Sequence, residues 1–123
     1  MPDSKRAAKA IAREEVRRIV ESREDVTLVD IRNHSAYKRS HIPGAEPFPF
    51  GASEPEAYPR RFPNKKKPLI IYDYKGDVAK IVADALIEQG YEDVSFMEGG
   101  HWAWRFMKGA KPKAKGAYPD RER

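Results

Sequence analysis

The sequence predicts an α/β domain built on a parallel sheet with helices on both faces. Short, β-branched apolar runs alternate along the chain with segments whose apolar residues recur at helical spacing. The 123 residues are enough for one domain with a single core. Every apolar run is shorter than the roughly 20 residues that span a membrane. We therefore expect one soluble domain, with no membrane segment and no signal peptide.

The first predicted elements are a helix and a buried strand. Residues 1–10 are polar and are expected to fray. A strand is predicted over 26–31, where Asp30 interrupts the apolar run and needs a partner, such as a backbone N–H or Arg32. A helix is predicted before it, over about 12–22, with an apolar stripe of Ala12, Val16, Ile19 and Val20.

The next part of the chain is dominated by turns and prolines. Ser35 is expected to cap a short helix over residues 36–39. A turn follows over 41–45, where proline and glycine fix the backbone. Residues 46–63 are rich in proline and aromatic side chains, which predicts an extended, loop-like segment. A loop of this length in a small domain is often functional or packs on the body through its aromatics.

The rest of the chain is organised around a strand, a tight loop and a helix. An apolar strand is predicted over 69–72, and a compact turn follows over 73–77. Gly90 stands where the next helix should stop. The apolar face of that helix is predicted to be Val78, Ile81, Val82, Ala85 and Leu86. Free backbone N–H groups and the positive end of the helix dipole make such a loop suitable for an anion.

The last predicted elements are a short strand over 93–97 and a short helix over 101–107. Trp102 and Trp104 in that helix are expected to belong to the core, although a partner surface is the alternative. Residues 110–123 are poor in aliphatic side chains and rich in Lys, Pro and Gly, which predicts a disordered tail.

Composition excludes several kinds of chemistry. The chain has no cysteine, so disulfides, thiolate metal sites and cysteine nucleophiles are excluded. The histidines at 34, 41 and 101 show no metal-ligand spacing, and we expect neither a metal nor another cofactor. The formal net charge is +5, with basic residues gathered at the two ends. Nucleic acid is not an expected partner, because no platform of interleaved aromatics accompanies this charge.

Three segments, in this order and spacing, identify a family. They are VTLVDIRNHSAYKRSHIPGA (residues 26–45), LIIYDYKGDVAKIVADALIEQGYEDV (69–94) and FMEGGHWAW (96–104). Together they resemble the single-domain rhodanese-like proteins of the sulfurtransferase family. The resemblance covers roughly residues 11–108, between a frayed N-terminal segment over 1–10 and a basic tail over 109–123.

The resemblance implies a three-layer α/β/α fold with a five-stranded parallel sheet. It also implies an active-site loop after the fourth strand, opening with a cysteine that carries sulfane sulfur as a persulfide. In this chain, Asp73 stands at the cysteine position. The loop has the short length seen in sulfurtransferases, and Val78 stands where some members have an arginine. The candidate binding loop is Asp73, Tyr74, Lys75, Gly76, Asp77 and Val78.

A carboxylate cannot hold sulfane sulfur as a stable intermediate, because the persulfide chemistry needs a thiolate. We therefore interpret the chain as a catalytically inactive, cytoplasmic binding or regulatory module. Its partner, a protein or small molecule, would meet the loop pocket through a cationic or hydrogen-bond-donating group. Asp73 would accept the N–H groups that the loop offers.

Two enzymatic alternatives remain open. One is a thiosulfate-type sulfurtransferase whose cysteine has been substituted. The other is a hydrolase with Asp73 as the nucleophile, which needs a cation and a general acid. Asp77 could share a metal with Asp73, but it is more simply explained as the N-cap of a helix that starts at Val78.

Overall fold

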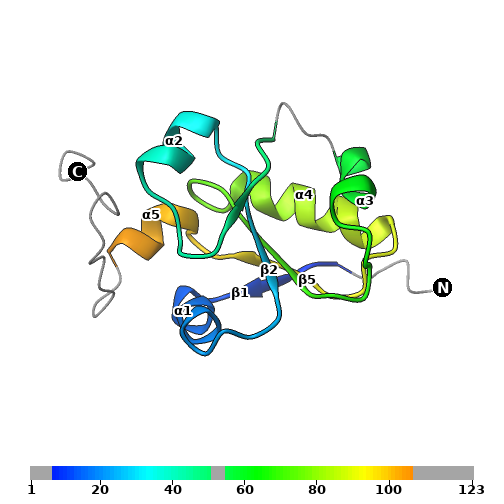
Figure 1. Cartoon of the computed structure of the whole chain (residues 1–123), viewed down its shortest axis with the longest axis horizontal. Coiled ribbons are helices and arrows are strands. Elements are labelled where there is room, and N and C mark those ends of the chain that lie inside the picture. The colour runs from blue at the N-terminus through cyan, green and yellow to red at the C-terminus, as the bar shows by residue number, and fades with distance from the viewer. Residues whose placement is uncertain (1–6, 51–54, 107–123) are drawn as a thin grey trace.

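A five-stranded parallel sheet forms the centre of the molecule (Figure 1). The computed structural model describes residues 7–50 and 55–106. The strands lie in the order β1-β5-β4-β2-β3, and every pairing is parallel. Their bounds are β1 (Lys9–Ile11), β2 (Thr27–Asp30), β3 (Glu46–Pro47), β4 (Leu69–Tyr72) and β5 (Val94–Met97). The expected sheet is therefore confirmed.

Helices cover both faces of this sheet, which makes three layers. Figure 1 shows α1 below the sheet, with α3 and α4 above it. In the described residues no helix is both long and apolar enough to cross a membrane. The helices are α1 (Arg13–Glu21), α2 (His34–Arg39), the 3-10 turn η2 (Pro55–Ala57), α3 (Tyr58–Arg61), α4 (Asp77–Glu88) and α5 (Gly100–Arg105).

Strand β4 divides the core into two clusters by simple alternation. Leu69 and Ile71 pack against α3 and α4, whereas Ile70 and Tyr72 pack on the other face with residues of α1 and α5. All four residues are buried, as expected for a central parallel strand covered on both sides. The loop that follows β4 therefore starts from the buried centre of the sheet.

Two short edge strands were not individually predicted. Lys9 and Ala10, expected to fray, pair with β5 as part of β1. Glu46 and Pro47, expected to be loop, pair with β2 as β3. Strands of two or three residues carry too little alternation to be recognised in a sequence. Residues 1–6 of the segment predicted to fray, and the whole predicted tail over 109–123, lie outside the described residues.

The proline-rich segment is more ordered than expected. Residues 55–61 form η2 and α3, because Tyr58 is buried and its ring packs against those of Phe48 and Phe62. The helix tolerates Pro59 because proline fits the first turn of a helix. The prediction of an extended loop over the whole of 46–63 was therefore wrong.

The cap of α2 also differs from the prediction. The helix starts at His34, two residues before the expected start, and Asn33 is its N-cap. The side-chain carbonyl of Asn33 accepts a hydrogen bond from the Ala36 N–H at 2.8 Å. Ser35 lies inside the first turn and is not the cap. Asn and Ser are about equally good caps, so residue type alone could not choose between them.

Helix α4 lies where it was predicted, and Gly90 follows its C-cap. Its buried face differs from the prediction, because each buried residue lies one position after the residue predicted to be buried. The segment is apolar on two overlapping stripes, and the alanine-rich stripe faces the sheet, where small side chains permit close approach. Val78 and Ile81 are consequently 36% and 64% exposed. The buried residues are Ala79, Val82, Ala83, Leu86 and Ile87.

Candidate functional site

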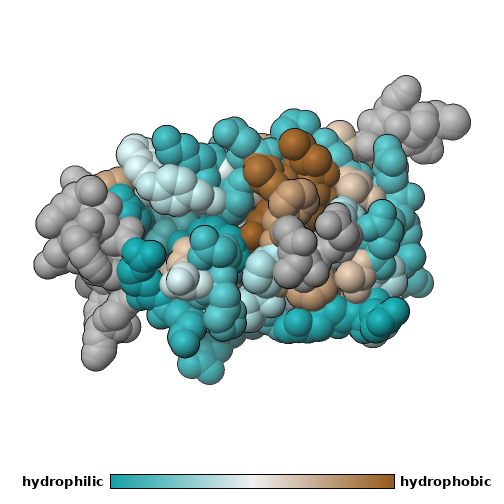
Figure 2. Space-filling view, turned by 90° about the horizontal axis from the view of Figure 1, so that it is seen from above, coloured by the Kyte–Doolittle hydropathy of each residue, from teal (hydrophilic) through white to brown (hydrophobic). Residues whose placement is uncertain are grey.

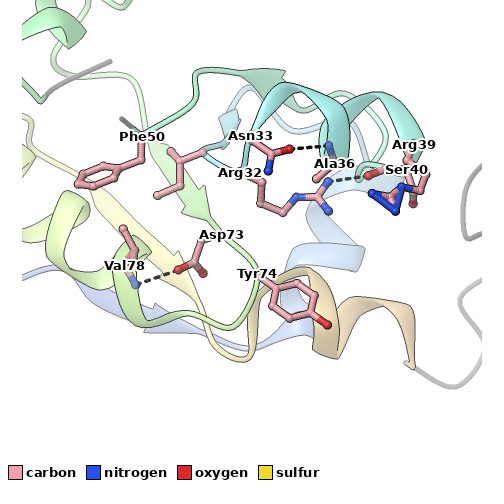
Figure 3. Close-up of a pocket in the computed structure, with 10 residues that line it drawn as sticks. Arg32, Asn33, Ala36, Arg39, Ser40, Phe50, Asp73, Tyr74 and Val78 are labelled. Carbon is pink, nitrogen blue, oxygen red and sulfur yellow. Dashed lines mark hydrogen bonds between the residues drawn. The ribbon is translucent and has the colours of Figure 1, made fainter. Parts of the chain in front are cut away.

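The candidate site is the loop between β4 and α4, which is built around the carboxylate of Asp73. This side chain is 8% exposed. Its Oδ1 accepts the N–H of Gly76, and its Oδ2 accepts those of Val78 at 2.8 Å and Ala79 at 3.1 Å. Figure 3 shows the bond to Val78. These N–H groups lie at the first turn of α4, where the helix itself offers no acceptor. The carboxylate therefore occupies the anion-binding position that the sequence predicted for this loop.

The start of α4 corrects the role predicted for Asp77. The helix begins at Asp77, and its N-cap is Gly76, with a φ of 105°. That backbone conformation favours glycine. Asp73 rather than Asp77 accepts the free N–H groups, because the tight turn at Gly76 brings the start of the helix back onto Asp73. Asp77 is an exposed acidic residue of the first turn, where it complements the helix dipole.

Helix α5 holds the loop from the other side. The backbone carbonyl of Asp73 accepts the N–H of His101 at 2.9 Å, and that of Tyr74 accepts the N–H of Trp102 at 3.0 Å. Gly100 permits this approach, since a Cβ there would lie 2.5 Å from the Tyr74 carbonyl oxygen. Gly100, in the FMEGGHWAW segment, thus allows the start of α5 to bind the backbone of the loop.

A buried ion pair supports the floor of the site. Asp30 is fully buried at the end of β2, where the sequence analysis required a partner for it. Arg32 supplies that partner through two parallel hydrogen bonds, Nε to Oδ1 at 3.0 Å and Nη2 to Oδ2 at 2.8 Å. The Tyr72 hydroxyl donates to Asp30 Oδ2 at 2.7 Å and accepts the N–H of Ile42 at 3.1 Å. The ends of β2 and β4 are therefore joined by a satisfied polar network.

Burial shifts the pKa values of this network strongly. Burial opposes the charge on Arg32, but its hydrogen bonds to the Asp30 carboxylate and the negative charge of that group outweigh burial, and the pKa of Arg32 lies above its usual value. Burial, reinforced by the nearby Asp30 charge, raises the pKa of Tyr72 well above its usual range. Burial also lowers the pKa of His101 to about 3, helped by the positive charges of Arg32 and Arg105. His101 is thus neutral at neutral pH.

A pocket of about 540 Å³ opens in front of Asp73, between the loop and α2. Figure 3 shows the Asp73 carboxylate and the Val78 side chain on one side of this space, with Arg32 and Asn33 on the other. In the described residues, no group of three or more His, Asp or Glu side chains could hold a metal ion. The lining residues are Ile31, Arg32, Asn33, Ala36, Arg39, Ser40, Phe50, Asp73, Tyr74 and Val78.

Half of the predicted loop residues line this pocket. Asp73, Tyr74 and Val78 do so, whereas Lys75, Gly76 and Asp77 do not. The missed residues come from the end of β2, from α2 and from Phe50 in the proline-rich segment. The residues at the end of β2 could have been predicted from the order of the strands, because the carboxyl ends of neighbouring parallel strands meet at one edge of a sheet. No pattern in the sequence points to Phe50.

The comparisons with known proteins agree with this geometry. A model of the rhodanese-like domain family matches residues 12–106. Thiosulfate sulfurtransferase GlpE of Pseudoalteromonas translucida is 38% identical over 82 residues, which are 67% of this chain and 75% of the relative. The protein of the same name from Coxiella burnetii is 30% identical over 81 residues, 66% and 73% of the two chains. The chain therefore belongs to the rhodanese-like domain family.

Solved structures show the same fold. The rhodanese-like domain protein of Staphylococcus aureus superposes with a TM-score of 0.66 at 25% identity, covering 84% of this chain and 96% of that one. The chain described here has no cysteine, which is consistent with a substituted active-site cysteine. The resemblance inferred from the three sequence segments is thus confirmed.

Proposed function

We propose that this protein is a catalytically inactive rhodanese-like domain that acts as a binding or regulatory module through the pocket in front of Asp73. One observation carries the proposal: the Asp73 carboxylate accepts the three N–H groups that a bound anion would otherwise receive. A carboxylate fixed in this way mimics the charged state of a loaded cysteine without its chemistry. The persulfide step has no thiolate to use, because cysteine is absent from the whole chain.

The same contacts disfavour a hydrolase that uses Asp73 as nucleophile. Three hydrogen bonds from backbone N–H groups stabilise the carboxylate and draw electron density away from its oxygens. Attack on a phosphoryl group would have to break some of these bonds, and a charged donor to neutralise the phosphoryl oxygens would be needed as well. Lys75 does not line the pocket. Arg32 does, but it is already paired with Asp30, so that charge would have to come from Arg39.

The pocket favours an apolar group that carries one hydrogen-bond donor. A carboxylate has about four acceptor positions, of which the loop uses three, so one position on Oδ1 remains for a ligand. The walls include Ile31, Phe50 and Val78. Viewed from above, Figure 2 shows a strongly apolar area over α4, where Val78 and Ile81 are exposed. Apolar walls of this kind fit the apolar side chain of a partner or a small aromatic molecule.

Three small probes that share one ring test this proposal. Benzylammonium and benzyl alcohol each offer a donor, whereas benzoate offers a second carboxylate. We expect the first two to shift the backbone amide NMR signals of Asp73, Tyr74 and Val78. Benzoate should bind more weakly, because its charge repels the Asp73 carboxylate. The variant Val78→Ser should weaken all three probes, because it removes an apolar part of the wall, whereas Ile87→Val, in the core under α4, should not.

Tightest binding of benzoate would contradict the proposed ligand chemistry. Shifts confined to residues away from the pocket would contradict the proposed site. Either result would leave the two enzymatic alternatives as the remaining explanations of the pocket.

A further inference from the structure

Three aromatic side chains lie exposed on one surface beside the candidate site. Tyr74, Trp102 and Phe106 are 47%, 43% and 55% exposed. The rings of Trp102 and Phe106 meet edge to face, with centroids 5.0 Å apart. Trp102 was expected to be core, but only Trp104 is buried. Large aromatic side chains that cluster at a surface often mark an interaction site, whereas single exposed apolar side chains do not.

Two basic side chains are interleaved with these rings. The Lys75 ammonium lies 5.9 Å from the ring centre of Tyr74 and 5.7 Å from that of Trp102. The Arg105 guanidinium lies 4.8 Å from the ring centre of Phe106. We call these five residues the α5 aromatic surface. It alternates flat rings with positive charges at cation–π distances.

The backbone holds this surface in place. Tyr74 and Trp102 come from separate elements, and the hydrogen bond from the Trp102 N–H to the Tyr74 carbonyl, at 3.0 Å, joins them. Figure 3 shows the Tyr74 ring on the side of the loop that faces α5. A ligand would therefore meet rings that are already positioned, with little ordering cost.

The sequence directly after α5 is strongly basic. Residues 107–123 contain six Lys or Arg and two Asp or Glu, a formal net charge of +4 out of +5 for the whole chain. These residues follow Phe106 without interruption. Most of the net charge of the chain thus belongs to residues that follow the last residue of the aromatic surface in the sequence.

We propose that the α5 aromatic surface binds single-stranded nucleic acid. Such a strand alternates flat bases with phosphates, and proteins that bind it combine stacking rings with cations that follow the backbone. An acidic peptide would satisfy the charges but would leave the flat rings unused. An anionic membrane would require a long amphipathic helix, whereas α5 has six residues. This proposal replaces the expectation that nucleic acid is not a partner, since the fold brings together the interleaved aromatics that the linear sequence does not show.

Fluorescence anisotropy of a labelled single-stranded oligonucleotide of mixed sequence, titrated with the full chain, tests the proposal. Trp102→Ala and Phe106→Ala should each weaken binding roughly tenfold, the loss of one stacked base. The matched control is Ile81→Ala, which removes an exposed apolar side chain from α4 and should leave the affinity unchanged. Circular dichroism of each variant establishes that it is folded.

Salt dependence separates stacking from charge. Replacing Lys108, Lys111, Lys113 and Lys115 by Gln should lower the slope of log K against log salt concentration by up to about 3, while the effect of Trp102→Ala persists at every salt concentration. The proposal is overturned if the full chain does not bind the oligonucleotide at low salt. It is also overturned if both aromatic variants bind like the parent, or if polyglutamate or anionic vesicles bind as tightly as the oligonucleotide.

Discussion

The carboxylate of Asp73 accepts the backbone N–H of Val78 at 2.8 Å, across the loop that joins β4 to α4. This contact places a fixed negative charge at the positive end of α4. It couples Asp73 to the first turn of the helix. The loop thus has an anion of its own, and this explains its conformation.

Removing this carboxylate should destabilise the loop and create a site for an added anion. In Asp73→Ala, the N–H groups of Gly76, Val78 and Ala79 lose their acceptor, and we expect a loss of about 2 kcal/mol in the free energy of unfolding by urea. Added formate should recover part of that loss, compared with chloride at equal ionic strength.

Asp77→Ala is the matched control, since Asp77 lies in the same turn but is exposed. It should cost about 0.5 kcal/mol, the value of a charge near a helix end, and should not respond to formate. Equal stability of Asp73→Ala and the parent protein would show that the carboxylate does not hold the loop.

Gly100→Ala should damage the contact between the loop and α5. A Cβ at Gly100, where φ is 58°, would lie 2.5 Å from the Tyr74 carbonyl oxygen and 2.6 Å from that of Asp73. The backbone must move, and we expect a loss of at least about 3 kcal/mol, measured by urea unfolding. Gly44→Ala, with a φ of 86° but nothing within 4 Å of the new Cβ, should cost only about 1 kcal/mol. Equal losses would show that steric contact with the loop is not what matters at Gly100.

Acid should destabilise the fold through His101. Its pKa is lowered from 6.5 to about 3 in the folded protein, mainly by burial, so the unfolded chain takes up this proton at a higher pH than the folded protein. The stability that the buried neutral His101 contributes is fully present above pH 6.5 and is lost progressively as the pH falls toward 3. The loss is roughly 2 to 3 kcal/mol at pH 4.5. Urea unfolding of the parent and of His101→Gln at pH 7.5 and 4.5 measures it. The stability difference between the two proteins should shrink in acid, and a difference that is the same at both pH values would be inconsistent with a buried neutral His101.

The main elements of the fold could be predicted from the sequence because their apolar patterns are long. The strand over 69–72 and the helix after it carry this signal, and the structure has β4 and α4 at those places. The rotation of α4 could not be predicted, because Val78 and Ile81 are as apolar as the residues that are buried instead. Which stripe faces the sheet is decided by packing against β4 and β5.

The site was predictable only in part. Asp73 stood out because it replaces a residue type that the family's chemistry requires, and the satisfied N–H groups around it follow from general properties of helix ends. The opposite wall, from Ile31 to Ser40, depends on strand order, which no local pattern specifies. The α5 aromatic surface likewise depends on the contact between Tyr74 and Trp102, which lie far apart in the sequence.

The central claim is that one residue separates this pocket from sulfur transfer. The most direct measurement is a thiosulfate:cyanide sulfurtransferase assay on the protein and on Asp73→Cys, side by side. We predict no rate above the blank for the parent chain and a measurable rate for Asp73→Cys, whose thiolate would receive the N–H groups now bound by Asp73. Sulfur transfer by the parent chain would contradict the account, because it would require a sulfur carrier in a chain that has no cysteine.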